Sequence, residues 1–280
     1  MSGTIKGIRV LELTQIMAGP TCGLLLADLG AEVIKIEKIQ GGDDTRRFLP
    51  PDVNGESAAF MMMNRNKKGL ALDLKSKEGV EIFKTLVKHS DVVIENFRKG
   101  TLERLGIGYD VMSKINPKII LCEISGYGRT GPYSDKGGFD LIAQGMSGLM
   151  SITGESAEKP PIKVGAPLTD ITAGLLATSG ILAALIHRDK TGEGQVVDTS
   201  LYEAGIVHTY WQSAIASATG ESPGPLGSAH PLTAPYQAFK TKDKWITVGA
   251  SNQNTWLKLI KALGREDLQE NEKFSDNKSR

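Results

Sequence analysis

Asp170 is the residue of this sequence whose surroundings best suit a nucleophile. It lies in the segment I-K-V-G-A-P-L-T-D-I-T-A-G, residues 162–174, where an apolar extended run gives way to a helical pattern that reaches about His187. A carboxylate between a strand-like run and a helix is held on stiff elements, as a nucleophile with a fixed angle of attack must be. The competing interpretation is structural, because Asp or Thr in front of a helix is most often a cap.

The electrostatics of this position predict how open it must be. A helix amino terminus stabilises a carboxylate by about 0.3–1 kcal/mol, whereas full burial raises a carboxyl pKa by up to about 3–5 units. Desolvation therefore outweighs the helix. We expect Asp170 to be partly open to a cleft or to accept backbone N–H bonds.

The other reactive side chains predict neither a metal site nor a tightly bound cofactor. The cysteines lie far apart in apolar surroundings, and the histidines show no metal-ligand spacing: Cys22 and Cys122, and His89, His187, His208 and His230. The segment G-Y-G-R-T-G, residues 126–131, matches a dinucleotide-binding pattern, but P-Y-S-D-K-G-G follows it as loop instead of the required helix. A nicotinamide or flavin site is therefore disfavoured.

Basic residues gather in the first hundred or so positions: Lys38, Arg46, Arg47, Arg65, Lys67, Lys68, Lys75, Arg98 and Arg104. Each taken singly is typical of a solvated face. Cations that converge from several loops would instead suit a ligand with several phosphates, such as coenzyme A.

The composition excludes some partners. The chain has 280 residues and a formal net charge of +1, with 33 Lys and Arg against 32 Asp and Glu, which disfavours a nucleic-acid partner. Residues 1–6 show no leader pattern, and no apolar run approaches the ~20 residues that span a bilayer. We expect no membrane association and a cytoplasmic protein, with the mitochondrial matrix as the alternative.

Strand and helix patterns alternate, which predicts an α/β fold with a mostly parallel, Rossmann-like sheet. Strands are expected at 8–13, 32–36, 70–74, 91–94, 118–124 and 195–199, and helices at 21–29, 79–89, 170–187 and 202–218. Functional loops in such sheets follow the carboxyl ends of strands, here at 14–20, 95–100 and 125–131.

We expect a large α/β domain at 1–218, a Gly-, Pro- and Ser-rich linker at 219–229 and a smaller α+β domain that begins at 230–280. The last part predicts a hairpin, 236–239 with 245–248, and a helix at 254–263. Because this is too little for a complete domain, the chain is expected to be truncated at its carboxyl end.

Seven collinear segments resemble the class III coenzyme A transferases, the family of formyl-CoA, carnitine-CoA and succinyl-CoA-dependent transferases and the related 2-methylacyl-CoA racemases. These segments are G-I-R-V-L-E-L-T-Q-I-M-A-G-P (7–20), L-G-A-E-V-I-K-I-E (29–37), G-D-D-T-R (42–46), N-R-N-K-K-G (64–69), I-E-N-F-R-K-G (94–100), G-Y-G-R-T-G-P (126–132) and V-G-A-P-L-T-D (164–170).

The resemblance implies roles for particular residues. Asp170 matches the family's nucleophile, which forms covalent anhydride and thioester intermediates. The positions that match coenzyme A contacts are Ile16, Lys38, Leu72, Lys75, Asn96, Phe97 and Arg104. A loop that closes over the acyl group in some relatives matches Gly249, Ala250, Ser251, Asn252 and Gln253, although only one of the five is Gly here. The implied partners are an acyl-CoA, a small carboxylic acid and a second copy in an interlocked homodimer.

Two departures from the family pattern narrow the activity. Met17 stands where the formyl-CoA:oxalate type has Gln, which argues against that specificity. The racemase branch has Gly-His-Asp where this chain has Gly138-Phe139-Asp140, and Phe cannot transfer a proton. We therefore favour a transferase, with an acyl-CoA racemase or epimerase and an inactive coenzyme A-binding fragment as the alternatives. A dicarboxylate such as a succinyl group is the expected acid.

Overall fold

The computed structural model describes residues 3–280, which form two compact units. The first unit comprises residues up to Ser147 together with Gly165–His208, and the second comprises Gly148–Val164 together with Thr209–Arg280. The contact boundary at His208 thus precedes the expected domain boundary at residue 218. The assignment of the functional domains and of the linker stays a prediction.

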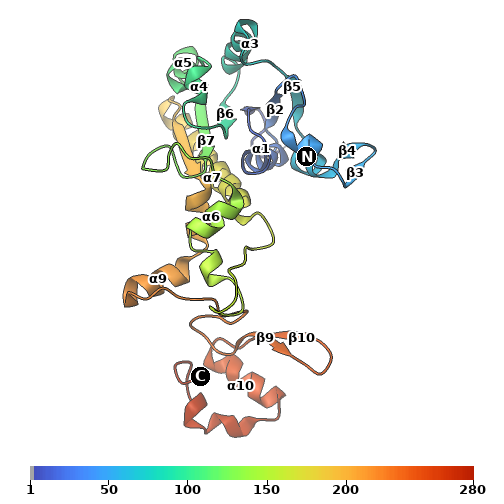
Figure 1. The fold of residues 1–280 in the computed structure, drawn as a ribbon. Helices are drawn as coiled ribbons and strands as arrows, with labels where there is room; N and C mark the ends of the chain where they lie inside the picture. The colour runs from blue at the N-terminus through green and yellow to red at the C-terminus, as the bar shows by residue number, and fades with distance from the viewer. Residues whose placement is uncertain (1–2) are drawn as a thin grey trace. The chain divides into compact units, whose positions relative to one another are not determined.

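A six-stranded parallel sheet forms the centre of the first unit, in the order β5-β2-β1-β6-β7-β8 (Figure 1). This confirms the α/β fold with a parallel sheet. The strands are β1 (Arg9–Glu12), β2 (Glu32–Glu37), β5 (Lys68–Ala71), β6 (Val92–Glu95), β7 (Ile120–Ser125) and β8 (Val196–Ser200). A short antiparallel pair is formed by β3 (Asp52–Val53) and β4 (Glu56–Ser57).

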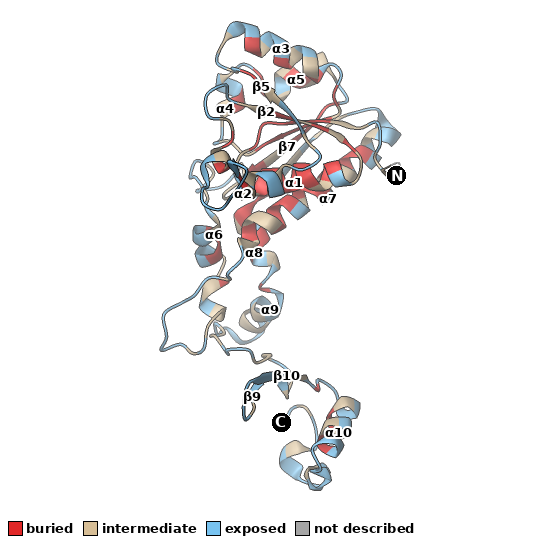
Figure 2. Ribbon diagram, turned by 90° about the vertical axis from the view of Figure 1, so that its right-hand side faces the viewer, coloured by how far each residue is buried: buried red, intermediate tan, exposed pale blue. Residues whose placement is uncertain are grey.

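Helices cover both faces of this sheet, with α3 and α5 on one side and α1 and α7 on the other (Figure 2). The helices of the first unit are α1 (Ala18–Asp28), η1 (Asp44–Arg47), α2 (Ala58–Met63), α3 (Lys77–Val87), α4 (Thr101–Arg104), α5 (Tyr109–Ile115), α6 (Asp140–Met146), α7 (Leu168–Thr191) and α8 (Leu201–Val207).

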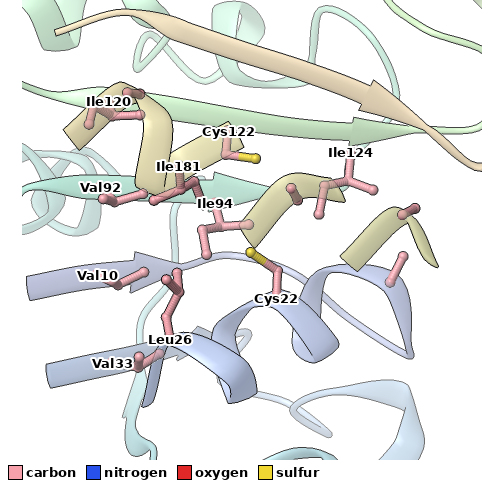
Figure 3. Close-up of a cluster of buried hydrophobic side chains, with 14 of the residues drawn as sticks. Val10, Cys22, Leu26, Val33, Val92, Ile94, Ile120, Cys122, Ile124 and Ile181 are labelled. Atoms are coloured by element: carbon pink, nitrogen blue, oxygen red, sulfur yellow. The ribbon is translucent and has the colours of Figure 1, made fainter. Parts of the chain in front are cut away.

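The strands alternate between two apolar clusters because successive side chains point to opposite faces. On β6, Val92 and Ile94 join the cluster that contains α1 and α7, whereas Val93 joins the cluster that contains α3 and α5. Burial on both faces explains why the strands read as short continuous apolar runs. Figure 3 shows the first cluster, including the free thiols of Cys22 and Cys122. The prediction of buried thiols is confirmed.

Helix α7 has the length and the apolar composition of a membrane span, and half of its most apolar stretch is buried within the structure. It packs closely on α1, since a Cβ on Gly174 would lie 2.8 Å from the backbone oxygen of Ala18. A buried core helix meets the same length and composition criteria. The helix is therefore weak grounds for a membrane location.

The second unit contains η2 (Met150–Ile152), α9 (Tyr210–Thr219), β9 (Tyr236–Lys240), β10 (Trp245–Gly249), α10 (Gln253–Ala262), η3 (Glu266–Gln269) and η4 (Glu272–Phe274). The predicted hairpin is confirmed by the antiparallel pairing of β9 and β10. Buried Trp256 stacks on Phe274 at 5.9 Å between ring centroids, and the Arg280 guanidinium lies 4.9 Å from the Trp256 ring.

Two sequence expectations about elements are wrong. The expected helix at 202–218 is two helices, because α8 ends at Val207 and α9 begins at Tyr210. The strand-like run before Asp170 forms no strand at residues 161–167. Pro161 and Pro167 lack the N–H groups that a central strand needs.

Candidate active site

The site lies at the carboxyl edge of the parallel sheet, where the order of strands reverses between β1 and β6. Loops that follow two such strands diverge and leave a crevice for a ligand. Here the loops are joined by a pair of hydrogen bonds. The backbone N–H of Gln15 donates to Asn96 Oδ1 at 3.0 Å, and Asn96 Nδ2 donates to the Gln15 carbonyl at 2.9 Å.

Two cavities open at this edge, and Gln15 and Phe97 line both of them. The larger has a volume of about 610 Å³ and is lined by Asp170, Ile16 and Asn96 among others. The smaller has a volume of about 230 Å³. The shared residues place the two cavities side by side, so an extended ligand could occupy both.

Asp170 lies in the first turn of α7, two residues after the helix begins at Leu168, and is only partly exposed. Burial, and then the negative charge of Asp140, raises the pKa of Asp170 to about 7. Within residues 3–280, the structure gives its carboxylate no hydrogen-bond donor. The expectation of a carboxylate that opens to a cleft agrees with its place in the wall of the larger cavity.

Asp140 fixes the turn that presents Asp170. Its Oδ1 accepts hydrogen bonds from the backbone N–H of Thr169 at 3.0 Å and from the Thr169 hydroxyl at 2.8 Å. Its Oδ2 accepts a hydrogen bond from Gln144 at 2.8 Å. Because Pro167 supplies no side-chain cap to α7, a carboxylate from α6 caps this helix instead.

The residues expected to contact coenzyme A divide between the two cavities. Ile16, Asn96 and Phe97 line the larger one, and Phe97 also lines the smaller one together with Lys38, Leu72 and Lys75.

Arg104 lines neither cavity but donates to the hydroxyl of Thr101, a lining residue of the smaller cavity, at 2.9 Å. Thus the structure brings together Asp170 and all but one of the proposed coenzyme A contacts. Their roles in binding stay predictions.

Most of the basic cluster noted in the sequence is engaged elsewhere. Arg46 pairs with Glu37 at 2.8 Å, Lys68 pairs with Glu32 at 2.6 Å, and Arg65 pairs with Asp28. Lys38 lies by the smaller cavity, but its ammonium pairs with Asp44 at 2.8 Å. Only part of the cluster, including Lys38, Lys75 and Arg98, lines the cavities.

The loop from Gly249 to Gln253 belongs to the second unit, where it joins β10 to α10. The N–H of Ala250 donates to the Pro235 carbonyl at 2.8 Å, and the N–H of Asn252 donates to the Thr255 hydroxyl at 3.2 Å. These two amides are therefore engaged within their own unit. The role of the loop in closing over an acyl group stays a prediction.

Sequence reasoning missed Arg129, which lines the larger cavity and contacts carboxylates from three strands. Its guanidinium contacts Glu95 and lies 3.1 Å from Glu123, and its backbone N–H donates to Asp198 at 3.1 Å. Burial, and then the charges of Asp198 and Glu103, raises the pKa of Glu123 to about 7. Polar residues at the ends of neighbouring strands were the available signal.

Of the glycines in the 126–131 motif, Gly126 serves packing, whereas a Cβ on Gly128 or Gly131 would meet no neighbouring atoms, and these two have φ values of 87° and 83°. A Cβ on Gly126 would lie 2.6 Å from the Cα of Gly138, so the two backbones touch. The next helix, α6, begins at Asp140, which confirms that loop and not helix follows the motif. Gly126 and Gly138 both line the larger cavity, together with Phe139 and Asp140, so this contact forms part of the cavity wall.

Comparison with known proteins identifies the family of this chain. The model of CoA-transferase family III matches residues 5–280. The chain is 41% identical to the succinate–glutarate CoA-transferase of Agrobacterium fabrum, over 99% of the chain and 70% of that protein. It is 42% identical to the succinyl-CoA:glutarate CoA-transferase of Mus musculus, over 98% of the chain and 62% of that protein.

A solved structure of a CAIB/BAIF family protein from Brucella suis is similar over the whole chain and 75% of its own length, with a TM-score of 0.87 and 40% identity. The chain thus spans only about two thirds of the length of the curated relatives it matches. A match that runs from residue 5 to the last residue shows that this chain belongs to CoA-transferase family III.

Proposed function

We propose that this protein transfers coenzyme A from an acyl-CoA to a carboxylic acid, with Asp170 as the covalent nucleophile. The observation that carries this proposal is a carboxylate of raised pKa at the first turn of a buried helix, in the wall of a 610 Å³ cavity. Such a group is partly ionised at neutral pH and is a stronger nucleophile than a carboxylate of ordinary pKa.

The reaction proceeds through two kinds of adduct. The ionised Asp170 attacks the thioester carbonyl, the C–S bond breaks, and coenzyme A leaves as a thiolate from an aspartyl acyl anhydride. The thiolate then attacks the aspartyl carbonyl, which releases the donor carboxylate and leaves an aspartyl thioester. The acceptor carboxylate attacks this thioester, and the released thiolate takes the acceptor acyl group from the second anhydride. Asp170 is regenerated, and the cycle divides one difficult transfer into easier steps.

The two adjoining cavities fit the needs of this cycle. The thiolate must stay near Asp170 while the acyl groups change, which requires coenzyme A to remain bound between steps. The smaller cavity has an apolar wall with Lys38 and Lys75 at its rim, which suits a ligand that is apolar in part and carries phosphates. The larger cavity would hold the reacting acyl group beside Asp170.

A dicarboxylic acid is the proposed substrate class. Arg98, Lys99 and Lys136 line the cavity that contains Asp170, so a second carboxylate of the substrate has cations to meet there. The curated relatives named above are transferases of succinate and glutarate. By family resemblance we also propose the interlocked homodimer as the active assembly.

An exchange assay tests the proposal. The protein is incubated with succinyl-CoA and isotopically labelled glutarate, and the labelled glutaryl-CoA is measured by mass spectrometry, with Asp170→Ala as the control. We expect exchange that requires both substrates and is absent in the variant. Coenzyme A binding without exchange for any dicarboxylate pair would favour the inactive fragment, and proton exchange beside the thioester without an acceptor acid would favour the isomerase.

A further inference from the structure

Four charged side chains are buried together next to the candidate site, and the proposed reaction uses none of them. They are Glu12, Lys35, Asp43 and Lys67, which we call the buried charge network. Each of these side chains is at most 2% exposed, and the two carboxylates balance the two ammonium groups. Buried charges persist only when paired and hydrogen-bonded, so a network of this size needs an explanation.

Lys35 is the centre of the network. It lies on β2 directly beside Glu12 of β1 in the register of the sheet. Its ammonium group lies 2.9 Å from Glu12 Oε1 and 2.9 Å from Asp43 Oδ2. It also donates to the Thr14 carbonyl at 2.9 Å. Lys35 therefore contacts three parts of the chain at once: the end of β1 at Glu12, the loop after β1 at Thr14, and the segment before η1 at Asp43.

Lys67, the residue before β5, completes the network. Its ammonium group lies 2.8 Å from Glu12 Oε2 and donates to the Pro20 carbonyl at 2.9 Å. Helix α1 leaves space for these charges, since a Cβ on Gly23 would come within 1.8 Å of Glu12 Oε2.

Asp43 links the network to the loop that lines the cavities. Its Oδ1 accepts a hydrogen bond from the backbone N–H of Ile16 at 3.2 Å and also from the N–H and hydroxyl of Thr45, both at 2.9 Å. Ile16 has a φ of 70°, which a β-branched residue adopts only under strain. The surroundings must supply the stabilisation that this backbone lacks, and the Asp43 hydrogen bond does so directly.

The loop that the network holds is the one between the two cavities. Thr14 and Gln15 line the smaller cavity, and Gln15, Ile16 and Met17 line the larger one. Hydrogen bonds hold this loop at three consecutive residues: Thr14 is bonded to Lys35, Gln15 to Asn96, and Ile16 to Asp43.

Lys35 and Asp43 stabilise each other's charged forms. Burial alone would lower the pKa of Lys35, but Glu12 and Asp43 outweigh it and raise the pKa above the ordinary value. Burial would raise the pKa of Asp43, but Lys35 and the Thr45 hydrogen bonds lower it. The pair therefore stays ionic where a transferase would work.

We propose that Lys35 and Asp43 are positioning residues that hold the loop of residues 14–17 in its strained shape between the two cavities, so that coenzyme A and Asp170 meet in one geometry. This inference rests on the proposed function for the identity of the ligand. That Lys35 and Asp43 hold the loop follows from their hydrogen bonds to Thr14 and Ile16 alone.

A comparison of Asp43→Ala with the charge-balanced double variant Lys35→Met/Asp43→Ala tests the proposal. The single variant leaves Lys35 with one carboxylate fewer and should lose stability. The double variant leaves Glu12 and Lys67 as a balanced pair and should regain much of it. Both variants remove the acceptor of the Ile16 N–H. Asp28→Asn, which breaks the exposed pair between Asp28 and Arg65, is the matched control.

The expected result separates positioning from stability. In both variants we expect faster amide hydrogen exchange in peptides that cover residues 14–17 and about tenfold weaker coenzyme A binding by calorimetry, as expected for one lost buried hydrogen bond. The control should match the wild-type protein in both measurements. If the double variant regains wild-type coenzyme A affinity and wild-type exchange together with stability, the network is only structural and the proposal is wrong.

The readouts distinguish this proposal from the proposed function. Amide exchange of the loop does not depend on catalysis, and calorimetry with coenzyme A does not depend on an acceptor acid. A protein that binds coenzyme A without transferring it would contradict the proposed transferase activity, and the positioning role of Lys35 and Asp43 could still be tested. Unchanged amide hydrogen exchange of residues 14–17 in the variants of an active protein would contradict the positioning role alone.

Discussion

The Asp140 carboxylate accepts hydrogen bonds from both the backbone N–H and the hydroxyl of Thr169, at 3.0 and 2.8 Å. Asp140 thus caps helix α7 at Thr169. The residue that follows Thr169 in this helix is the second acid, Asp170. The same carboxylate adds its charge to the burial that raises the pKa of Asp170 to about 7. Asp140 therefore controls both the position and the ionisation of the proposed nucleophile.

Asp140→Asn should move the acid limb of the pH–rate profile to lower pH. The change removes a negative charge but keeps an oxygen that can accept from Thr169. Because burial is the larger cause of the raised pKa, we expect the limb to move by less than about one pH unit. The measurement is kcat/KM between pH 5 and about 9. Asp189→Asn, at the exposed far end of α7, is the control, and an equal shift there would contradict the assignment.

Asp170→Asn should stabilise the protein at alkaline pH and not at acid pH. The folded-state pKa of about 7 exceeds the ordinary value of 3.8, so the folded chain keeps a proton that the unfolded chain releases. The stability that this group contributes is complete below about pH 4 and is lost as the pH rises through about 7.

After allowance for the partial exposure of the side chain, we expect the variant to exceed the wild-type protein by roughly 1–3 kcal/mol at pH 8. Urea unfolding at pH 4.5 and at pH 8 measures the difference, with Asp189→Asn again as the control. An equal difference at both pH values would show that the carboxylate is not strained by its surroundings.

Arg129→Gln should destabilise the first unit strongly. The change leaves Glu95 and Glu123 without the guanidinium that contacts both, and removal of one partner from a buried ion pair costs about 3–5 kcal/mol. Arg129→Lys should recover only part of this, since Lys lacks the fork that contacts two carboxylates. Thermal unfolding ranks the three proteins. A loss below about 1 kcal/mol for Arg129→Gln would mean that solvent already screens the cluster.

Gly126→Ala should lower stability by about 1–3 kcal/mol because the new Cβ would lie 2.6 Å from the Gly138 backbone, which cannot rotate away. Gly224→Ala is the matched control, since a Cβ there meets open space. We expect the first variant alone to lose stability and coenzyme A exchange. Equal unfolding midpoints for both variants would contradict a packing role for Gly126.

Much of the fold could be predicted because the strands are buried on both faces and leave short Val- and Ile-rich runs, as at Val92–Glu95. The start of α7 was harder to predict from the sequence. The pattern predicted an extended, strand-like run before Asp170, whereas these residues pair in no strand of the structure. The division of the 202–218 helix depends on tertiary contacts such as the 2.7 Å hydrogen bond between Thr172 and His208, which no local pattern contains.

The candidate site could be predicted only through family resemblance for most of its residues. Asp170 could be singled out by its place at the start of a helix. The capping contact from Asp140 joins residues 29 positions apart, so no local sequence pattern predicts it. Lys35 had a weak signal, as a single cation within the apolar strand pattern E-V-I-K-I-E. Its partner Asp43 lies in a loop, where a carboxylate is ordinarily exposed.

Mapping the covalent adduct tests the account most directly. The protein is mixed with succinyl-CoA, trapped with hydroxylamine and digested, and the modified residue is identified by mass spectrometry. We predict a hydroxamate on Asp170 that is absent from Asp170→Ala. A hydroxamate on another residue, or equal labelling in the variant, would contradict Asp170 as the nucleophile.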